Sequence, residues 1–437
     1  MKDLDLHDQL TSGMRFFILI VINVIVISGA NYVLSTKLTP SLYAGYAFLI
    51  ANANLLAILL TMGYDLSANK YLSKYLIDNE SSLARGFMNM TRIKIIKAAI
   101  ICILITIIYW FIEPIIEKTY QIEMPEEEMA VWFNIAILFG ILNIFTVIMR
   151  CLGRTELGFL LGIFLPSLLI LIIAILIPEG LHTFKHFNQI MLYIFLAYMI
   201  PVLIGVITTH ILFKKEVRHS AASNYTNKLD WSKSSKIMMF YAFIAAAGNV
   251  IPINVLELYS GGSVSKDQIG AFALAFNIVY TIFTIPLLTT KGTIMAVLYP
   301  LYSKGDHKSL QTIILYSNRL SLAFNLTIVL LFIAFNSYIS NLISAGYNGF
   351  IAVFLLLCAG FAIDLSLNTT RTSLLMLGSE RKVLFNRLVT VTLQLILSLI
   401  IGYHYGMYGV CIVIIITRNL AAIQMMLELK KLGYKSL

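Results

Sequence analysis

The chain has 437 residues, of which 59% are hydrophobic and 12% are charged, and its mean hydropathy is +0.84. A water-soluble chain of this length does not need so much apolar surface, so the composition indicates an integral membrane protein. The formal charge of +10 comes from basic residues in the loops between apolar runs, where they set membrane topology, and we expect no nucleic-acid partner.

The apolar runs are long enough, at about 1.5 Å per residue, to cross a hydrocarbon core of roughly 30 Å as helices. They do not have the short alternating pattern of barrel strands. We predict twelve spans, at residues 16–38, 43–62, 93–112, 129–149, 157–177, 189–213, 237–258, 269–290, 315–335, 350–370, 383–403 and 408–427. No small-residue cleavage pattern follows the first run, which we therefore predict to be a retained helix.

Basic residues favour one set of loops. That set carries Lys70, Lys74, Arg85, Arg92, Lys94, Arg150, Arg154, Lys214, Lys215, Arg218, Lys228, Lys233, Lys236, Lys304, Lys308, Arg381, Lys382, Arg387, Lys430, Lys431 and Lys435. The opposite side carries Lys37, Lys118, Lys185 and Lys266. Because basic loops stay in the cytoplasm, we expect both termini there.

The longest basic connection, residues 214–236, predicts a cytoplasmic linker between an N-terminal lobe at 1–213 and a C-terminal lobe at 237–437. The expected fold is thus all-α, with about twelve membrane helices in two six-helix bundles. Residues 65–79 mix apolar residues with lysines, which fits either a short helix on the inner membrane surface, with its apolar stems in lipid, or an ordinary basic loop.

Glycine and asparagine residues, which are structurally costly in membrane helices, recur at a constant spacing of 225 positions. The pairs are Gly45 with Gly270, Asn52 with Asn277, Asn143 with Asn368, and Gly153 with Gly378. Both residue types are common in the chain, so coincidence is the alternative, but the constant offset favours an internal duplication and two pseudo-symmetric bundles.

The sequence lacks the patterns that catalysis or metal binding would need. There is no nucleophile–base set, no phosphate loop and no histidine or cysteine spacing typical of metal ligands. The four cysteines lie in or beside apolar runs, where they read as small apolar residues. We expect neither an enzyme nor a metal site.

Amides inside the predicted spans are candidates for contact with a polar substrate, because a polar group is expensive in hydrocarbon. The candidates are Asn31, Asn52, Asn54, Asn249 and Asn277. Hydrogen bonds between helices are the alternative role for each of them.

Charged residues in or at the ends of spans are the stronger candidates. Arg15 begins the first span, Lys291 ends the eighth and Arg418 lies within the twelfth. Such cations suit a phosphate-bearing substrate, although snorkelling to lipid headgroups is the alternative. Arg418 needs a partner, for which Asp364 in the tenth span is the candidate.

Five segments carry a resemblance to a known family. They are MGYDLSANKYLSKYL after the second span, MRCLGRTELG after the fourth, IGAFALAFNIVY opening the eighth, YPLYSKGDHKSL after it and LLMLGSERKV after the tenth. With these segments the chain resembles the polysaccharide (O-antigen and capsule) flippases of the multidrug/oligosaccharidyl-lipid/polysaccharide exporter superfamily.

The resemblance implies two bundles in a V around a central cavity, lined by spans one, two, seven and eight. It implies flipping of an undecaprenyl-diphosphate-linked oligosaccharide between the leaflets of the bacterial inner membrane by alternating access, without a cofactor. It implies energy from a proton or sodium gradient or from the membrane potential, with Asp65, Glu257 and Asp364 as the candidates for ion coupling. A glycan polymerase and a chain-length regulator are the implied protein partners.

Two other functions compete. A drug/cation antiporter of the same superfamily should have a carboxylate deep in span one, and residues 16–38 contain none. A membrane glycan polymerase should have a large periplasmic loop, and no predicted loop on that side is long enough. The scarcity of deep cations favours a neutral or weakly charged glycan.

Overall fold

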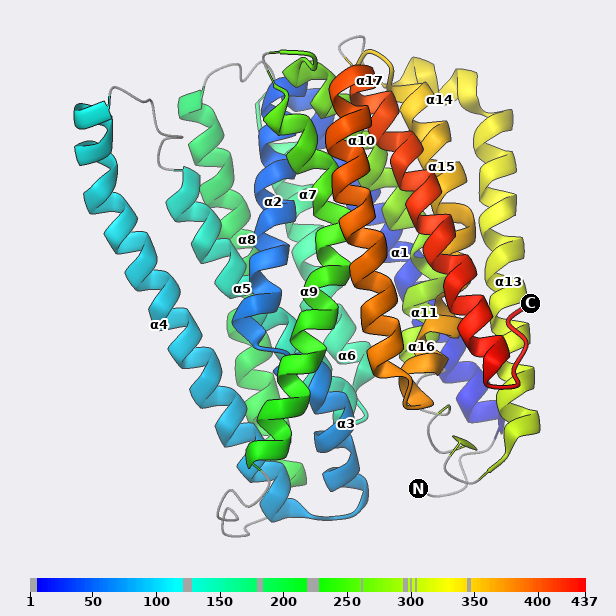
Figure 1. The fold of residues 1–437 in the computed structure, drawn as a ribbon. Coiled ribbons are helices and arrows are strands. Elements are labelled where there is room, and N and C mark those ends of the chain that lie inside the picture. The colour runs from blue at the N-terminus through cyan, green and yellow to red at the C-terminus, as the bar shows by residue number, and fades with distance from the viewer. Residues whose placement is uncertain are drawn as a thin grey trace. The chain divides into compact units, whose positions relative to one another are not determined.

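The computed structural model describes residues 6–120, 128–178, 184–217, 228–260, 262–293, 298, 301–302, 305–343 and 347–437. These ranges are helical with short connections and contain no β-sheet, only an isolated bridge between Ser260 and Val264 (Figure 1). The expected all-α class is confirmed. The middle of the predicted linker, residues 218–227, lies outside the described residues.

The helices of the first half of the chain are α1 (Leu6–Lys37), α2 (Pro40–Thr61), α3 (Tyr64–Ile77), α4 (Ser81–Tyr120), α5 (Glu128–Cys151), α6 (Thr155–Phe159), the π-helical turn η1 (Leu160–Phe164), α7 (Leu165–Leu176) and α8 (Phe184–Glu216). Those of the second half are α9 (Lys228–Leu258), α10 (Lys266–Phe283), α11 (Ile285–Thr293), α13 (His307–Ala334), α14 (Asn336–Leu342), α15 (Phe350–Ser366), α16 (Asn368–Met376) and α17 (Glu380–Lys431).

Within the described ranges, nine helical stretches are long and apolar enough to cross a membrane. They are Met14–Lys37, Pro40–Thr61, Asn134–Cys151, Thr155–Leu176, Gln189–Glu216, Asp230–Leu258, His307–Ala334, Phe350–Leu375 and Arg381–Lys431. The last stretch holds two of the predicted spans, the third predicted span lies in α4, and the eighth is divided between α10 and α11. Every predicted span therefore falls on helix.

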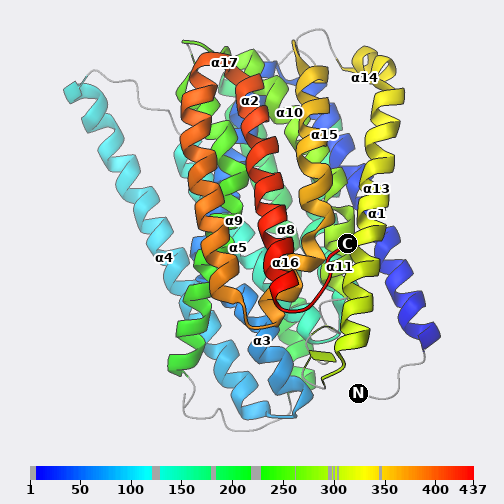
Figure 2. The ribbon, with the colours of Figure 1, turned by 45° about the vertical axis from the view of Figure 1, so that its right-hand side comes forward.

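α17 is two helical runs joined at a sharp turn. Gly406 has φ 57° and ψ −139°, a conformation outside the helical region that glycine adopts without the clash of a Cβ. The chain turns there, and the orange and red runs lie side by side in both views (Figures 1 and 2). The separate eleventh and twelfth spans are confirmed.

α10 has well-defined ends. It begins with a capping box, in which the Ser265 hydroxyl accepts from the Gln268 N–H and the Gln268 side chain accepts from the Ser265 N–H. It ends at Phe283, three residues before Pro286, which has no N–H to continue the helical hydrogen bonds. The eighth predicted span is therefore broken where its proline stands.

The internal duplication has a structural counterpart. Gly153 and Gly378, 225 positions apart, both have left-handed φ values, of 73° and 78°. Each precedes a helix whose start is also 225 positions from the other, at Thr155 and Glu380. The same backbone turn at the same offset, where glycine is favoured, supports two copies of one helical pattern.

The helices pack into two compact units. Unit 1 comprises residues 48–246, and unit 2 comprises residues 2–47 with 247–437. Residues of α1 and the start of α2 thus group with the C-terminal helices, and α9 contributes to both units. The lobes at 1–213 and 237–437, the linker at 214–236 and the cavity between the lobes stay predictions.

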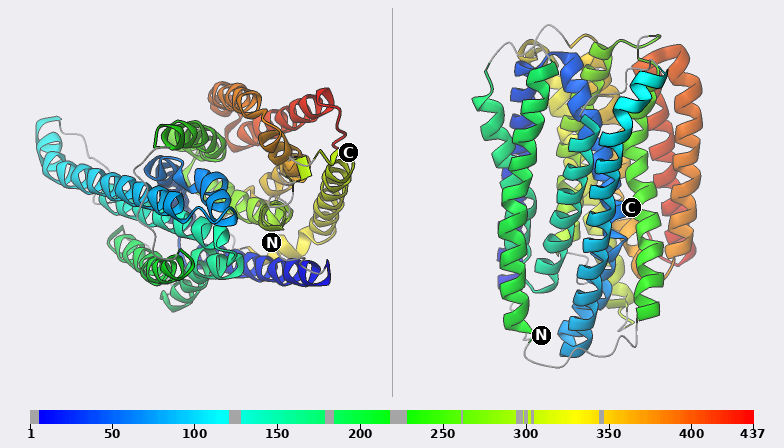
Figure 3. Two further views of the ribbon diagram at one scale, coloured as in Figure 1. Left: turned by 90° about the horizontal axis from the view of Figure 1, so that it is seen from below. Right: turned by 90° about the vertical axis from the view of Figure 1, so that its left-hand side faces the viewer.

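The core of unit 1 gathers around α3. The Trp231 ring is fully buried, stands edge-on to Phe87 at 5.5 Å between centroids and donates its N–H to the Tyr75 hydroxyl at 2.9 Å. Figure 3 (right) shows α4 continuing from this region as one long helix. Of the two alternatives for residues 65–79, the helix is present as α3, and its Leu72 and Tyr75 side chains are 0% and 5% exposed because they pack against protein.

The core of unit 2 gathers around α15, which packs against α10, α13 and α17. The Phe361 ring of α15 is fully buried and meets the rings of Phe276 and Tyr280 on α10 edge-on. This aromatic contact places α10 beside the polar residues of α15 and α17 that are described below.

Gly270 marks a close approach within unit 2. A Cβ added at this position would lie 2.2 Å from the Pro40 carbonyl oxygen, a distance that requires backbone movement. We predict that Gly270→Ala destabilises the protein by about 1–3 kcal/mol, the usual cost of overpacking. The measurement is thermal unfolding of purified protein in detergent.

Gly140→Ala is the matched control. A Cβ there would meet its nearest atom, the Ala57 carbonyl oxygen, at 3.5 Å, an ordinary contact. Because alanine is the better helix former by about 0.5–1 kcal/mol, this variant should melt at or above the wild-type temperature. Equal melting of the two variants would contradict the close packing of α10.

Candidate functional site

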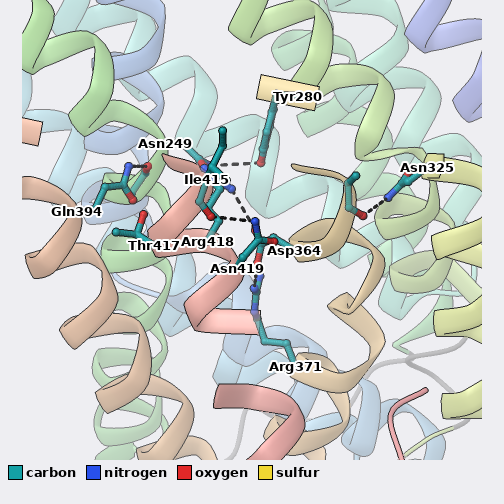
Figure 4. Close-up of polar contacts among 12 residues, drawn as sticks. Asn249, Tyr280, Asn325, Asp364, Arg371, Gln394, Ile415, Thr417, Arg418 and Asn419 are labelled. Carbon is teal, nitrogen blue, oxygen red and sulfur yellow. Dashed lines mark hydrogen bonds and ion pairs between the residues drawn. The ribbon is translucent and has the colours of Figure 1, made fainter. Parts of the chain in front are cut away.

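A buried ionic network lies within unit 2 (Figure 4). One oxygen of the Asp364 carboxylate is 2.8 Å from an Arg371 nitrogen, and the other is 3.2 Å from an Arg418 nitrogen. The side chains of Asp364 and Arg418 are 1% and 3% exposed, and that of Arg371 is 14% exposed. The predicted partnership of Arg418 with Asp364 is confirmed.

The local sequence places Arg371 on Asp364. α15 ends at Ser366, Leu367 has φ −94° and ψ 18°, and α16 begins at the next residue. Residues seven apart in a helix lie on nearly the same side, two turns and about 10 Å apart along the axis. The long arginine side chain crosses that distance to reach the carboxylate.

Arg418 makes further contacts. Its guanidinium donates to the Asn249 side-chain oxygen and lies 4.2 Å from the Phe361 ring centroid. Asn249 in turn donates to the Tyr280 hydroxyl at 3.3 Å. The network therefore joins α9, α10, α15, α16 and α17 through polar groups.

A third arginine acts on the same carboxylate. Arg387 of α17 is 6% exposed and interacts electrostatically with Asp364. We call Asp364, Arg371, Arg387 and Arg418 the arginine cluster. Within the described residues it sets three guanidinium groups against one carboxylate.

The energetics of the arginine cluster are finely balanced. Two opposite charges about 4 Å apart attract by about 4 kcal/mol at an effective dielectric of about 20. Removing each ion from water costs several kcal/mol, so a buried pair adds little net stability, although loss of one partner is costly. Both oxygens of the Asp364 carboxylate are thus paired with guanidinium groups.

A second polar group in unit 2 is centred on Tyr43, which is fully buried. Its hydroxyl donates to the Asn31 side-chain oxygen at 3.0 Å and accepts from Asn277 at 3.3 Å. Nearby, the Tyr347 hydroxyl donates to the Ser35 carbonyl oxygen at 3.1 Å. Two of the predicted amides thus meet through a tyrosine that the sequence analysis did not select.

Two other predicted amides bond within their own helix. Asn52 and Asn54 donate to the carbonyl oxygens of Phe48 and Ile50, one turn earlier in α2. Of the remaining residues, Arg15 is exposed on α1, Glu257 is half-buried near the end of α9, and Lys291 lies in α11 with its side chain outside the described set.

Asp65 lies in the first turn of α3, outside the membrane spans. Burial raises the pKa of its carboxyl group, while a hydrogen bond from the Thr61 hydroxyl at 3.0 Å acts in the opposite direction. The described residues offer this carboxyl group no salt bridge.

Sequence reasoning missed Arg387 and Tyr280 as members of the network. Arg387 reads as a basic loop residue because it follows Arg381 and Lys382, yet it is buried in α17. The signal that could have found it is its place inside the predicted eleventh span, at residues 383–403. In the described part of the chain, no three histidine, cysteine, aspartate or glutamate residues are placed to hold a metal ion.

No family model and no curated protein sequence matches the chain. Solved structures do match it. MATE in the bent conformation has a TM-score of 0.67 at 15% identity, covering 97% of this chain and 95% of that chain. A multidrug resistance MATE family transporter of the MOP superfamily, inward-facing, has 0.65 at 15%, covering 95% and 97%.

The lipid II flippase MurJ, in its inward closed conformation, has a TM-score of 0.64 at 13% identity, covering 95% of this chain and 87% of that chain. At such identities the likeness shows the fold alone. Nearly the whole chain is therefore similar in fold to membrane transporters of two kinds.

We predict that Asp364→Asn destabilises the protein by about 3–5 kcal/mol, because it leaves buried guanidinium groups without their carboxylate. The measurement is thermal and chemical unfolding of purified protein in detergent.

Glu428→Gln is the control for the loss of an ion pair. Glu428 bonds with Lys382 and Lys431, whose side chains are 59% and 67% exposed. An exposed pair of this kind should contribute less than about 1 kcal/mol. Equal losses of stability in the two variants would contradict the expectation that the buried ion pairs of Asp364 matter more to stability than an exposed pair.

Proposed function

We propose that the protein is a flippase that moves undecaprenyl-diphosphate-linked oligosaccharide, an O-antigen or capsule repeat unit, from the cytoplasmic to the periplasmic leaflet by alternating access. The observation that carries the proposal is the pair of guanidinium groups, of Arg371 and Arg418, on the buried Asp364 carboxylate within membrane-spanning helices. A lipid-linked diphosphate is an anion that must pass the apolar bilayer, and guanidinium groups bind phosphate oxygens in paired hydrogen bonds.

The fold and the polar residues support the same proposal. One structural neighbour is named as a lipid II flippase, and the chain covers most of its length. The amides and tyrosines around Asn249 and Tyr43 offer the neutral hydrogen-bonding groups that sugars need. Arg15, Asn31, Asn52, Asn54, Asn249, Asn277, Lys291 and Arg418 are the residues proposed to contact the substrate.

A drug/cation antiporter is the second candidate, because the MATE transporters match the fold equally well. Binding a cationic drug or a coupling ion calls for an accessible carboxylate. The carboxylate of Asp364 is engaged by two guanidinium groups, and span one contains no acidic residue. The charge of the site therefore favours the anionic substrate.

The proposal is tested by deleting the gene in a bacterium that makes a surface glycan. We expect lipid-linked repeat units to accumulate on the cytoplasmic side while surface glycan disappears. Unchanged surface glycan would exclude the flippase, and a raised sensitivity to cationic drugs instead would support the antiporter.

Complementation connects the activity to the residues. Lys291→Ala should lower export by roughly tenfold, the effect of losing about 1.4 kcal/mol from one charge-assisted hydrogen bond. Arg319→Ala, which removes an exposed arginine of α13, is the control and should export normally at the same membrane level.

A glycan polymerase and a chain-length regulator are the protein partners we propose.

We further propose that the protein lies in the bacterial inner membrane with both termini in the cytoplasm, as the basic loops require. Reporters fused after Lys228 and Leu437 should therefore report the cytoplasm, and one fused after Lys266 should report the periplasm. A periplasmic signal at Leu437 would reverse the orientation.

A further inference from the structure

The carboxylate of Asp364 is the only one of the three ion-coupling candidates that forms salt bridges within the described residues. Each of its oxygens faces a different guanidinium group, that of Arg371 at 2.8 Å and that of Arg418 at 3.2 Å. Both guanidinium groups are tethered to helices of the same unit, α16 and α17. The position that a dissolved cation would take beside this carboxylate is filled by the chain itself.

We infer that Arg371 and Arg418 are built-in counter-cations that determine the charge selectivity of this site, closing Asp364 to sodium and other alkali cations. Energy coupling through a cation bound at Asp364 is then absent. The inference concerns ion binding alone and does not depend on the identity of the transported glycan.

The surroundings of Arg418 show what the guanidinium excludes. It lies between two oxygens that would suit a hard cation, the Asp364 carboxylate oxygen and the Asn249 amide oxygen. It also lies over the face of the Phe361 ring, which holds a positive group in place. The oxygens that could bind a cation are present, but the Arg418 guanidinium is already bonded to them.

The two guanidinium groups also repel a cation. Arg371 and Arg418 place one positive charge beside each oxygen of the carboxylate. Removal of Arg418 alone leaves Arg371 on the carboxylate and Arg387 near it, so a cation is still repelled. Removal of Arg371 and Arg418 together frees both carboxylate oxygens of Asp364 from their salt bridges.

The test compares the melting temperature of purified full-length protein in sodium chloride and in N-methylglucamine chloride at equal ionic strength. Wild type and Asp364→Asn should each melt at the same temperature in both salts. The double variant Arg371→Gln with Arg418→Gln should gain at least about 2 °C in sodium, the shift expected when a ligand is present at several times its Kd. Adding Asp364→Asn to the double variant should abolish the gain.

Two results would overturn the inference. One is a sodium-dependent rise in wild type that Asp364→Asn removes, and the other is a folded double variant without any sodium response. If the double variant does not purify as a folded protein, binding of radioactive sodium to wild type and to Asp364→Asn decides the matter. Binding that requires Asp364 refutes the inference, and equal background binding supports it.

Discussion

The contact of Asp364 with two guanidinium groups is the constraint on which unit 2 depends. Taking a carboxylate and three arginines out of water is expensive, and the cost is tolerable only if the charges stay together. That requirement fixes the ends of α15 and α16, the rotation of α17 and the position of Asn249 on α9. The apolar packing around Phe361 then follows, since its ring covers the Arg418 guanidinium on one face. A polar network thus orders helices whose lipid-facing surfaces carry little specificity of their own.

The helices and the duplication could be read from the sequence because they depend on local chemistry. Apolar length predicts a span, and a glycine such as Gly153 or Gly378 marks a left-handed turn wherever it recurs. The pairing of Arg418 with Asp364 was also accessible, because an isolated charge in a span must find a partner. The grouping of Arg371 and Arg387 with that pair was not, because a basic residue near a span end reads equally well as a loop cation. Only packing shows that Arg387 is buried.

The fate of the predicted amides separates local from long-range requirements. Asn52 and Asn54 each bond to the preceding turn of α2, which any helix offers. Asn31 and Asn277 instead bond to the hydroxyl of Tyr43, and so tie the first helix to α10 within unit 2. The sequence pattern alone predicts the same role, contact with a polar substrate, for all four residues. The difference arises because Tyr43 is fully buried and its hydroxyl must be satisfied there.

The arginines around Asp364 determine the sign of the buried charge in this part of unit 2. A free carboxylate attracts cations. The same carboxylate no longer does so when a guanidinium group is bonded to each of its oxygens. The change requires only that arginines stand within reach, one on the next short helix and one on a neighbouring helix, as Arg371 and Arg418 do. Binding chemistry can therefore change through a few side chains on a common fold. The charge around Asp364 is thus determined by a few side chains and not by the arrangement of the helices.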